Sequence, residues 1–245
     1  MFSYTDISLT EIPNCVSLVI YNPTCNMKCP WCFNMTTKVK KPLTFKQMKD
    51  AIDEHIEFID GVVFSGGEPL TNPFLIKTIN YAKEKGLKVK LNTNGLVYKG
   101  LSKNIFIPYI DYINVSLKGF DHHYTDFLKP KNVSSCLLRC DTLEYSFVYS
   151  AAMWPRVYID VFHDFLKNKI RFDWMSLFAN EWSRPEIFTI TQMQTGECLN
   201  PQYNDCRVPT RDECISIARI FSDIPTRKLM VETKEYGRES INIIK

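Results

Sequence analysis

The sequence predicts an α/β fold, specifically a partial (β/α)6 TIM-like barrel of parallel strands, and two observations support this. Short apolar runs alternate along the chain with amphipathic helical stretches, a pattern typical of parallel sheets. The polar motifs fall just after the expected strands. Loops that follow the strands form the reactive face of βα barrels, so we expect these motifs to share one edge of the sheet.

The first half of the chain carries the clearest element signals. Thr44 and Gln47 form a capping-box pattern that predicts the start of a helix. Its apolar stripe consists of Phe45, Met48, Ile52, Ile56 and Ile59. A second helix is expected after Pro73, ending at Gly86. The expected strands are 17–21, 62–64, 87–91 and 112–117.

The second half is predicted from weaker patterns. A second capping box, at Thr210 and Glu213, predicts a helix through Phe221. Further helices are expected at 134–143 and 155–168, and further strands at 144–151, 187–193 and 228–232. The stretch 171–185 fits no element by its pattern.

Length and composition favour one domain in a reducing compartment. The 245 residues fit a single domain, 1–245, with a core at about 15–195 and a C-terminal helix and strand extension at about 196–245. A net charge of +3 is too small to indicate nucleic-acid binding. Nine cysteines without a signal-peptide pattern or a membrane-length apolar run predict a cytoplasmic protein.

Three cysteines directly after the first expected strand carry the strongest chemical signal. Cys25, Cys29 and Cys32 have the spacing C-x3-C-x2-C. Three thiolates on one loop can hold three irons of a [4Fe–4S] cube, leaving the fourth iron open to a small molecule. A zinc loop and unrelated thiols are the alternatives, although structural zinc sites need four ligands and no paired cysteines lie nearby.

This run resembles the signature of the radical S-adenosylmethionine (SAM) superfamily, C-x3-C-x-aromatic-C, with Trp31 at the aromatic position. The resemblance implies a [4Fe–4S] cluster and SAM as cofactors. In that family SAM chelates the open iron and is cleaved by one electron to a 5′-deoxyadenosyl radical. An electron donor such as flavodoxin or ferredoxin is therefore expected as a partner.

A second motif, Ser65-Gly66-Gly67-Glu68, follows the second expected strand. It resembles the GGE motif that contacts the methionyl amino group of SAM in this family. Bare glycine backbone allows such a close approach, although two glycines also serve an ordinary strand-to-helix turn. Gln192, at the end of the sixth expected strand, is a further candidate for contact with the nucleoside of SAM.

Two more segments resemble motifs of glycyl-radical-enzyme activases. The stretch that begins at Asn92 resembles D-T-N-G, with Asn92 in place of the aspartate. Ser116 and Lys118 lie in a stretch similar to D-L-K, in which the lysine is near the SAM carboxylate. Both acidic positions of the family's monovalent-cation site are replaced, so we expect that site to be altered or absent.

The stretches 7–13, 188–194 and 199–201 resemble segments of the activases of anaerobic ribonucleotide reductase. This resemblance implies hydrogen abstraction from a glycine Cα of a partner enzyme. Phe33 departs from it, since many activases have His there. The alternatives are a radical SAM enzyme acting on a small molecule, like 7-carboxy-7-deazaguanine synthase, or on a peptide, and a non-catalytic Fe–S or zinc protein. No catalytic side chain is assigned.

Three late cysteines leave an auxiliary metal site open as an alternative. Cys198 and Cys206 lie in an expected loop without a CxxC partner. Cys214 falls at helical spacing with Ala218 and Phe221, which is typical of a core position. Cys136 and Cys140, four residues apart, are likewise predicted to lie in the core.

Overall fold

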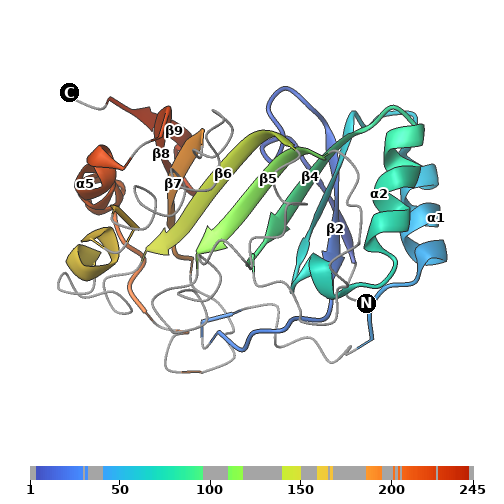
Figure 1. Ribbon diagram of the computed structural model, residues 1–245, viewed down its shortest axis with the longest axis horizontal. Coiled ribbons are helices and arrows are strands. Elements are labelled where there is room, and N and C mark those ends of the chain that lie inside the picture. The colour runs from blue at the N-terminus through green and yellow to red at the C-terminus, as the bar shows by residue number, and fades with distance from the viewer. Residues whose placement is uncertain are drawn as a thin grey trace.

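One mixed nine-stranded sheet organises the computed structural model of the chain (Figure 1). The structure describes residues 4–29, 31–32, 41–95, 110–117, 140–149, 159–164, 166–167, 186–194, 201, 204, 206–224 and 226–242. The strands are β1 Thr5–Ser8, β2 Ser17–Asn22, β3 Gly61–Gly66, β4 Lys88–Thr93, β5 Ile110–Leu117, β6 Cys140–Tyr149, β7 Ile187–Gln192, β8 Lys228–Thr233 and β9 Gly237–Ile241.

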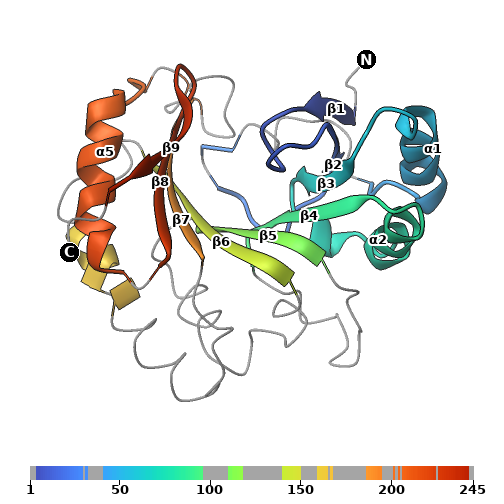
Figure 2. The same cartoon turned by 90° about the horizontal axis from the view of Figure 1, so that it is seen from above.

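The sheet is a partial barrel in which β1 to β9 lie side by side in sequence order. Strands β2 to β8 are parallel, whereas β1 and β9 pair antiparallel with their neighbours at the two edges. Figure 2 shows the sheet curving into an open trough, with β1 and β9 on opposite sides of the opening. The predicted fold class is therefore confirmed, with seven parallel strands instead of about six.

The sequence patterns missed the two edge strands and misassigned one segment. The last four residues of the predicted helix 134–143 belong to β6, because Cys140 to Leu143 pair with β5 in the sheet. Residues 134–139 and 171–185 lie outside the described part of the chain. Strand pairing with distant segments thus overrides the local helical pattern.

Helices cover the outer face of the sheet in both halves (Figures 1 and 2). Helices α1 (Phe45–His55) and α2 (Leu75–Glu84) lie beside β2 to β4, and α5 (Arg211–Ile220) packs against β7 and β8. Residues 159–164 and 166–167 are also helical, and η2 (Pro69–Thr71) and η6 (Phe221–Asp223) are short 3-10 helices. Both predicted capping boxes are present, at Thr44 and Thr210.

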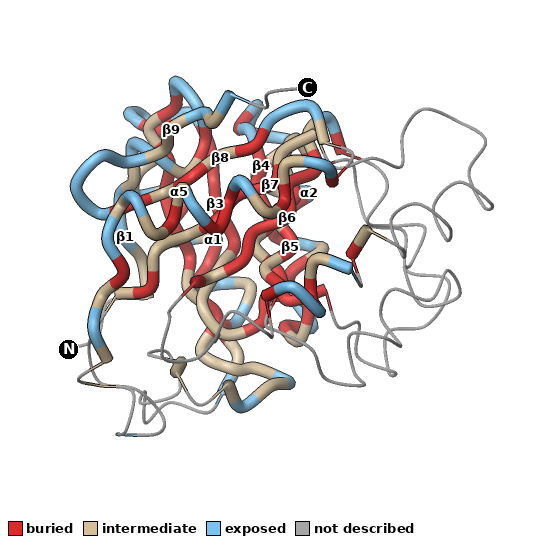
Figure 3. The backbone as a smooth tube through the Cα atoms, turned by 90° about the vertical axis from the view of Figure 1, so that its left-hand side faces the viewer, coloured by how far each residue is buried: buried red, intermediate tan, exposed pale blue. Residues whose placement is uncertain are grey.

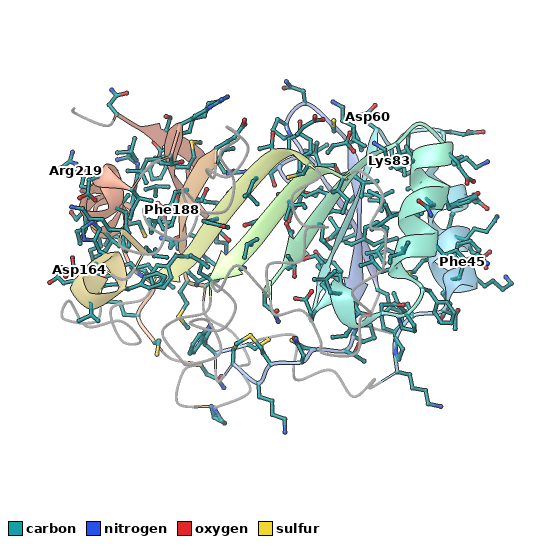
Figure 4. The ribbon with its side chains drawn as sticks, viewed as in Figure 1. Phe45, Asp60, Lys83, Asp164, Phe188 and Arg219 are labelled. Carbon is teal, nitrogen blue, oxygen red and sulfur yellow. The ribbon has the colours of Figure 1, made fainter. Side chains whose placement is uncertain are left out.

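The outer face of the sheet carries the apolar core. Phe188 of β7 stacks on Phe221 of η6 with ring centroids 5.2 Å apart, and Phe147 lies 4.9 Å from Phe162. Figure 4 labels Phe188 where β7 faces α5, and Figure 3 shows buried positions following the strands. Within the described residues, no helix is long and apolar enough to cross a membrane.

Candidate functional site

The cysteine loop leaves the C-terminal end of β2, and its three cysteines are partly exposed and form no disulfide within the described residues. The Met27 amide donates to Sγ of Cys25 at 3.4 Å, and the Cys32 amide donates to the carbonyl of Cys29 at 3.0 Å. An amide that donates to sulfur stabilises the thiolate form, which is the form that binds iron. The loop therefore has the donor set that a [4Fe–4S] cluster needs.

The arrangement of these thiols also bears on the kind of metal group. Within the described ranges, no three His, Cys, Asp or Glu side chains are grouped closely enough to hold a single metal ion. In a cube each thiolate binds a different iron, so the three sulfurs do not have to meet at one point. The predicted cluster ligands Cys25, Cys29 and Cys32 thus fit a cluster by donor type and by their common loop.

Asn94, just after β4, is a site residue that the sequence patterns did not single out. Its Nδ2 lies 2.8 Å from Oδ1 of Asn26 and 3.9 Å from Sγ of Cys25. This amide joins the end of β4 to the loop that carries the cysteines. The sequence signal was present, because Asn94 belongs to the same motif as Asn92.

Gly66 and Gly67 are required because their turn lies against the backbone that enters the cysteine loop. The Gly67 amide donates to the carbonyl of Asn22 at 2.7 Å, and the Glu68 amide donates to that of Thr24 at 2.7 Å. A Cβ at Gly67 would lie 2.3 Å from the Thr24 carbonyl oxygen. At Gly66, φ is +100° and a Cβ would lie 2.6 Å from the Asn22 nitrogen. The turn thus fixes the start of the loop.

Glu68 is fully buried behind this turn. Its carboxylate accepts hydrogen bonds from Oγ1 of Thr93 and from the Asn94 amide, both at 2.7 Å, and from the Leu70 amide at 3.0 Å. Such contacts are those of a positioning residue: Glu68 holds the end of β4, and with it Asn94, beside the cysteine loop. Contact between Glu68 and SAM, which the motif predicts, stays a prediction.

Asn22, the last residue of β2, ties the same region together and has no recognisable sequence signal. Its buried Nδ2 lies 2.8 Å from the Glu68 carbonyl, 2.9 Å from the Thr24 carbonyl and 3.1 Å from Oγ1 of Thr71. One side chain therefore connects β2, the glycine turn and η2. Its partners are about 2 to 49 residues away in sequence, which explains why local patterns did not reveal it.

The inner face of the sheet explains why asparagine stands at position 92. Nδ2 of Asn92 donates to Oε2 of Glu11 at 3.2 Å and to Oγ of Ser65 at 3.4 Å. Glu11 also pairs with Lys90 at 2.7 Å. Burial would raise the pKa of Glu11, but Lys90 and the Asn92 amide outweigh burial and lower it. An aspartate at position 92 would instead repel Glu11.

The remaining residues predicted to contact SAM lie on the cysteine loop, on β5 and β7, or outside the described residues. Ser116 of β5 and Trp31 of the cysteine loop are both half-buried, and Lys118 lies outside the described residues. Nε2 of Gln192 donates to the Pro209 carbonyl at 2.6 Å, and its Oε1 accepts from the Lys234 amide at 3.0 Å. The Gln192 amide is thus already used by neighbouring loops, and its contact with the nucleoside stays a prediction.

The described late cysteines are not grouped for a metal. Cys214 is fully buried in the core, as predicted, and burial raises the pKa of its thiol to about 11. Cys140 is also buried, and its pKa is raised to about 12. Cys206 is partly exposed, while Cys136 and Cys198 lie outside the described residues.

The partial barrel, the three-cysteine loop and the glycine turn against it define a class: iron–sulfur proteins that bind SAM at the strand ends of a βα barrel. A model of the radical SAM superfamily matches residues 19–140, about half of the chain. The chain belongs to this superfamily. Membership implies a [4Fe–4S] cluster and SAM as its cofactors, in agreement with the prediction.

Curated relatives include activating enzymes and enzymes of other reactions. The "Putative glycyl-radical enzyme activating enzyme" of Methanocaldococcus jannaschii is 37% identical over 51% of this chain and 52% of its own length. The Fe-coproporphyrin III synthase of Methanosarcina barkeri is 31% identical over 50% and 32%. The pyruvate formate-lyase-activating enzyme of Streptococcus mutans is 32% identical over 36% and 37%. The matches thus span about half or less of these relatives.

Solved structures support the fold. Streptococcus suis SuiB bound to S-adenosylmethionine aligns with a TM-score of 0.53 at 17% identity, over 82% of this chain and 45% of that one. TYW1 with a lysine-pyruvate adduct bound aligns with a TM-score of 0.58 at 13% identity, over 90% and 77%. At such low identity the likeness extends to the fold alone.

Proposed function

We propose that this protein cleaves SAM reductively and uses the resulting radical to generate a glycyl radical on a partner enzyme. The cluster and SAM would supply the chemistry when bound: one electron would break the S–C5′ bond into methionine and a 5′-deoxyadenosyl radical, which would take a hydrogen atom from the glycine Cα and leave as 5′-deoxyadenosine. The partner is an anaerobic ribonucleotide reductase or a related glycyl radical enzyme. The electron comes from a flavodoxin or ferredoxin, in a reducing compartment such as the cytoplasm.

One observation carries the proposal: a loop that offers three thiols, held by Asn94 and the glycine turn. Cys25, Cys29 and Cys32 would hold three irons, so that the fourth stays open for SAM. Asn94 orients the loop at Asn26, and the Gly67 amide holds the turn against Asn22 at the end of β2. These residues position the cofactors and take no proton themselves.

The choice of a protein substrate is supported by the relatives named as activating enzymes. A small-molecule substrate is the second candidate, because the Methanosarcina barkeri relative is named as a synthase of an iron porphyrin.

The experiment is anaerobic reconstitution with iron and sulfide, followed by reduction with dithionite in the presence of SAM. We expect 5′-deoxyadenosine by chromatography, and a doublet glycyl EPR signal when a glycyl radical enzyme of the same host is added. Failure to cleave SAM would refute the activity. Cleavage without a glycyl signal on any such enzyme would refute the partner and favour the small-molecule substrate.

A further inference from the structure

At β2 and β3 the inner face of the sheet carries a small apolar cluster that includes Val19 and Val63. From β4 to β9 it carries charged side chains, where most barrels are filled by branched apolar ones. Lys90, with 6% of its side chain exposed, pairs with Glu11, and Arg238 pairs with the buried Glu144 at 2.5 Å. Thr189 donates to Glu144 as well. Buried ion pairs add little net stability because both charges lose their water. Their presence on this face is therefore not explained by stability alone.

A third carboxylate on this face, that of Glu232, has no charge partner of its own. It lies opposite Arg238 in the register of β8 and β9, but Arg238 donates to Glu144. Across the described residues, the half-buried Glu232 carboxylate makes no hydrogen bond or ion pair within contact distance. With Lys90 and Arg238 each neutralised, the five charged groups leave one net negative charge, at Glu232.

Two side-chain amide oxygens on the same face also have no hydrogen-bond donor among the described residues. Oδ1 of Asn92 and Oδ1 of Asn114 are buried and have no hydrogen-bond partner in the described part of the chain. Asn92 lies opposite Asn114, which lies opposite Glu144, so these side chains form one row across β4, β5 and β6. An unpaired buried acceptor is costly, and a ligand that donates hydrogen bonds would remove that cost.

The two unpaired amide oxygens and the uncompensated carboxylate favour a ligand that carries a positive charge and donates hydrogen bonds. We propose that this inner face binds a positively charged side chain of the protein substrate, with Glu232 as its counter-ion and Asn114 as a further acceptor. The inference rests on the proposed function, since it assumes a protein substrate. A phosphate would find the charge of both buried cations already balanced by a carboxylate, although Nε of Arg238 has no hydrogen-bond partner among the described residues. An ammonium or guanidinium group instead finds an unpaired carboxylate and two unpaired amide oxygens.

Burial and the nearby Glu144 carboxylate raise the pKa of Glu232, although Arg238 opposes them. A cation bound beside Glu232 would lower that pKa again and would relieve the repulsion between the two carboxylates. SAM also carries a positive charge, so the cation bound beside Glu232 could come from SAM or from a substrate side chain. The test therefore has to separate a substrate side chain from SAM itself.

The test uses the reconstituted holoenzyme with SAM and two capped peptides, Ac-Ala-Lys-Gly-Ala-NH2 and its analogue with norleucine in place of lysine. Affinities are measured by saturation-transfer NMR. We expect the lysine peptide to bind tighter than the norleucine peptide. Glu232→Gln should weaken the lysine peptide about tenfold, the loss of one charge-assisted hydrogen bond, and leave the norleucine peptide unchanged.

A matched control comes from Glu235→Gln, which removes the same charge at an exposed position in the turn between β8 and β9. It should leave both affinities unchanged. Asn114→Leu supplies a second variant that keeps every charge and should weaken the lysine peptide about fivefold. Equal effects of Glu232→Gln and Glu235→Gln would overturn the inference, because the attraction would then be a general surface charge effect.

Two further results would also overturn it. Equal binding of both peptides to the unaltered protein would show that the face does not recognise a cation. A loss of SAM affinity in Glu232→Gln, with unchanged peptide affinity, would assign the carboxylate to SAM. In either case 5′-deoxyadenosine formation by the unaltered protein remains as the separate measure of the proposed function, so the two failures are distinguishable.

Discussion

The two faces of the sheet are built from the same strands but follow different physical rules. The outer face is apolar and covered by α1, α2 and α5, so its side chains stabilise the fold by leaving water. The inner face carries Glu11, Lys90, Glu144 and Arg238 in pairs that add little net stability. The cysteine loop and the glycine turn lie at its C-terminal edge. The outer face is thus where folding free energy is gained, and the inner face is where we expect chemistry.

The largest expected effect is at the edge between the two faces. Gly67→Ala places a Cβ 2.3 Å from the Thr24 carbonyl oxygen, so the turn must move away from the cysteine loop. We expect most of the visible absorbance of the cluster to be missing after reconstitution. Gly86→Ala is the control, since φ there is +77° but nothing lies within 4 Å of the new Cβ.

In the control, the strained backbone costs about 1–2 kcal/mol and the cluster should remain. Equal cluster content in both variants would show that the contact with Thr24 does not shape the loop. The motif alone predicts that a bulky residue at Gly67 would weaken SAM binding and leave the cluster in place. The geometry predicts loss of both, because the turn supports the loop directly.

On the outer face, Phe188→Ala should lower the free energy of unfolding by about 3–5 kcal/mol. Phe188 is fully buried and stacks on Phe221, so the cavity has rigid walls. Denaturant unfolding measures the loss, and the folded fraction should still cleave SAM. If SAM cleavage per folded molecule fell together with stability, the outer face would also contribute to the chemistry, and the assignment of stability to one face and chemistry to the other would be wrong.

On the inner face, Glu232→Gln should make the protein more stable at neutral pH. Its pKa is raised in the folded state by burial and by Glu144, while Arg238 and Lys90 oppose this and Glu11 adds to it. A carboxyl with a raised folded-state pKa loses stability as pH rises through its unfolded value towards the folded one. The glutamine variant should show a higher midpoint of thermal unfolding at pH 7 and no difference at pH 3. A lower midpoint at pH 7 would show that the carboxylate stabilises the fold.

Local signals predicted the elements that depend on neighbouring residues. The capping boxes at Thr44 and Thr210 begin α1 and α5, and the spacing of the cysteines identified their loop. The inner face was not predictable, because Arg238 and Glu144 are 94 residues apart in sequence. Likewise, the short edge strands β1 and β9 are defined by their pairing with β2 and β8, which no local pattern reveals.

The smallest expected effect is on the outer surface, at the start of α5. Arg207 and the backbone amide of Thr210 lower the pKa of Glu213 to about 2 by hydrogen bonding to its carboxylate. A depressed carboxyl pKa adds stability that is present above its ordinary pKa of 4.5 and is lost as pH falls towards 2. The site is largely exposed, so solvent screens much of the effect.

Glu213→Gln keeps an acceptor for the Thr210 amide but removes the charge. We therefore expect a slightly lower unfolding midpoint at pH 7 and convergence with the unaltered protein as pH approaches 2, measured by circular dichroism. SAM cleavage should not change, because α5 covers the outer face. If Glu213→Gln altered peptide or SAM affinity, as we expect only of Glu232→Gln, a charge on the outer surface would be acting on the inner site and the two faces would not be independent.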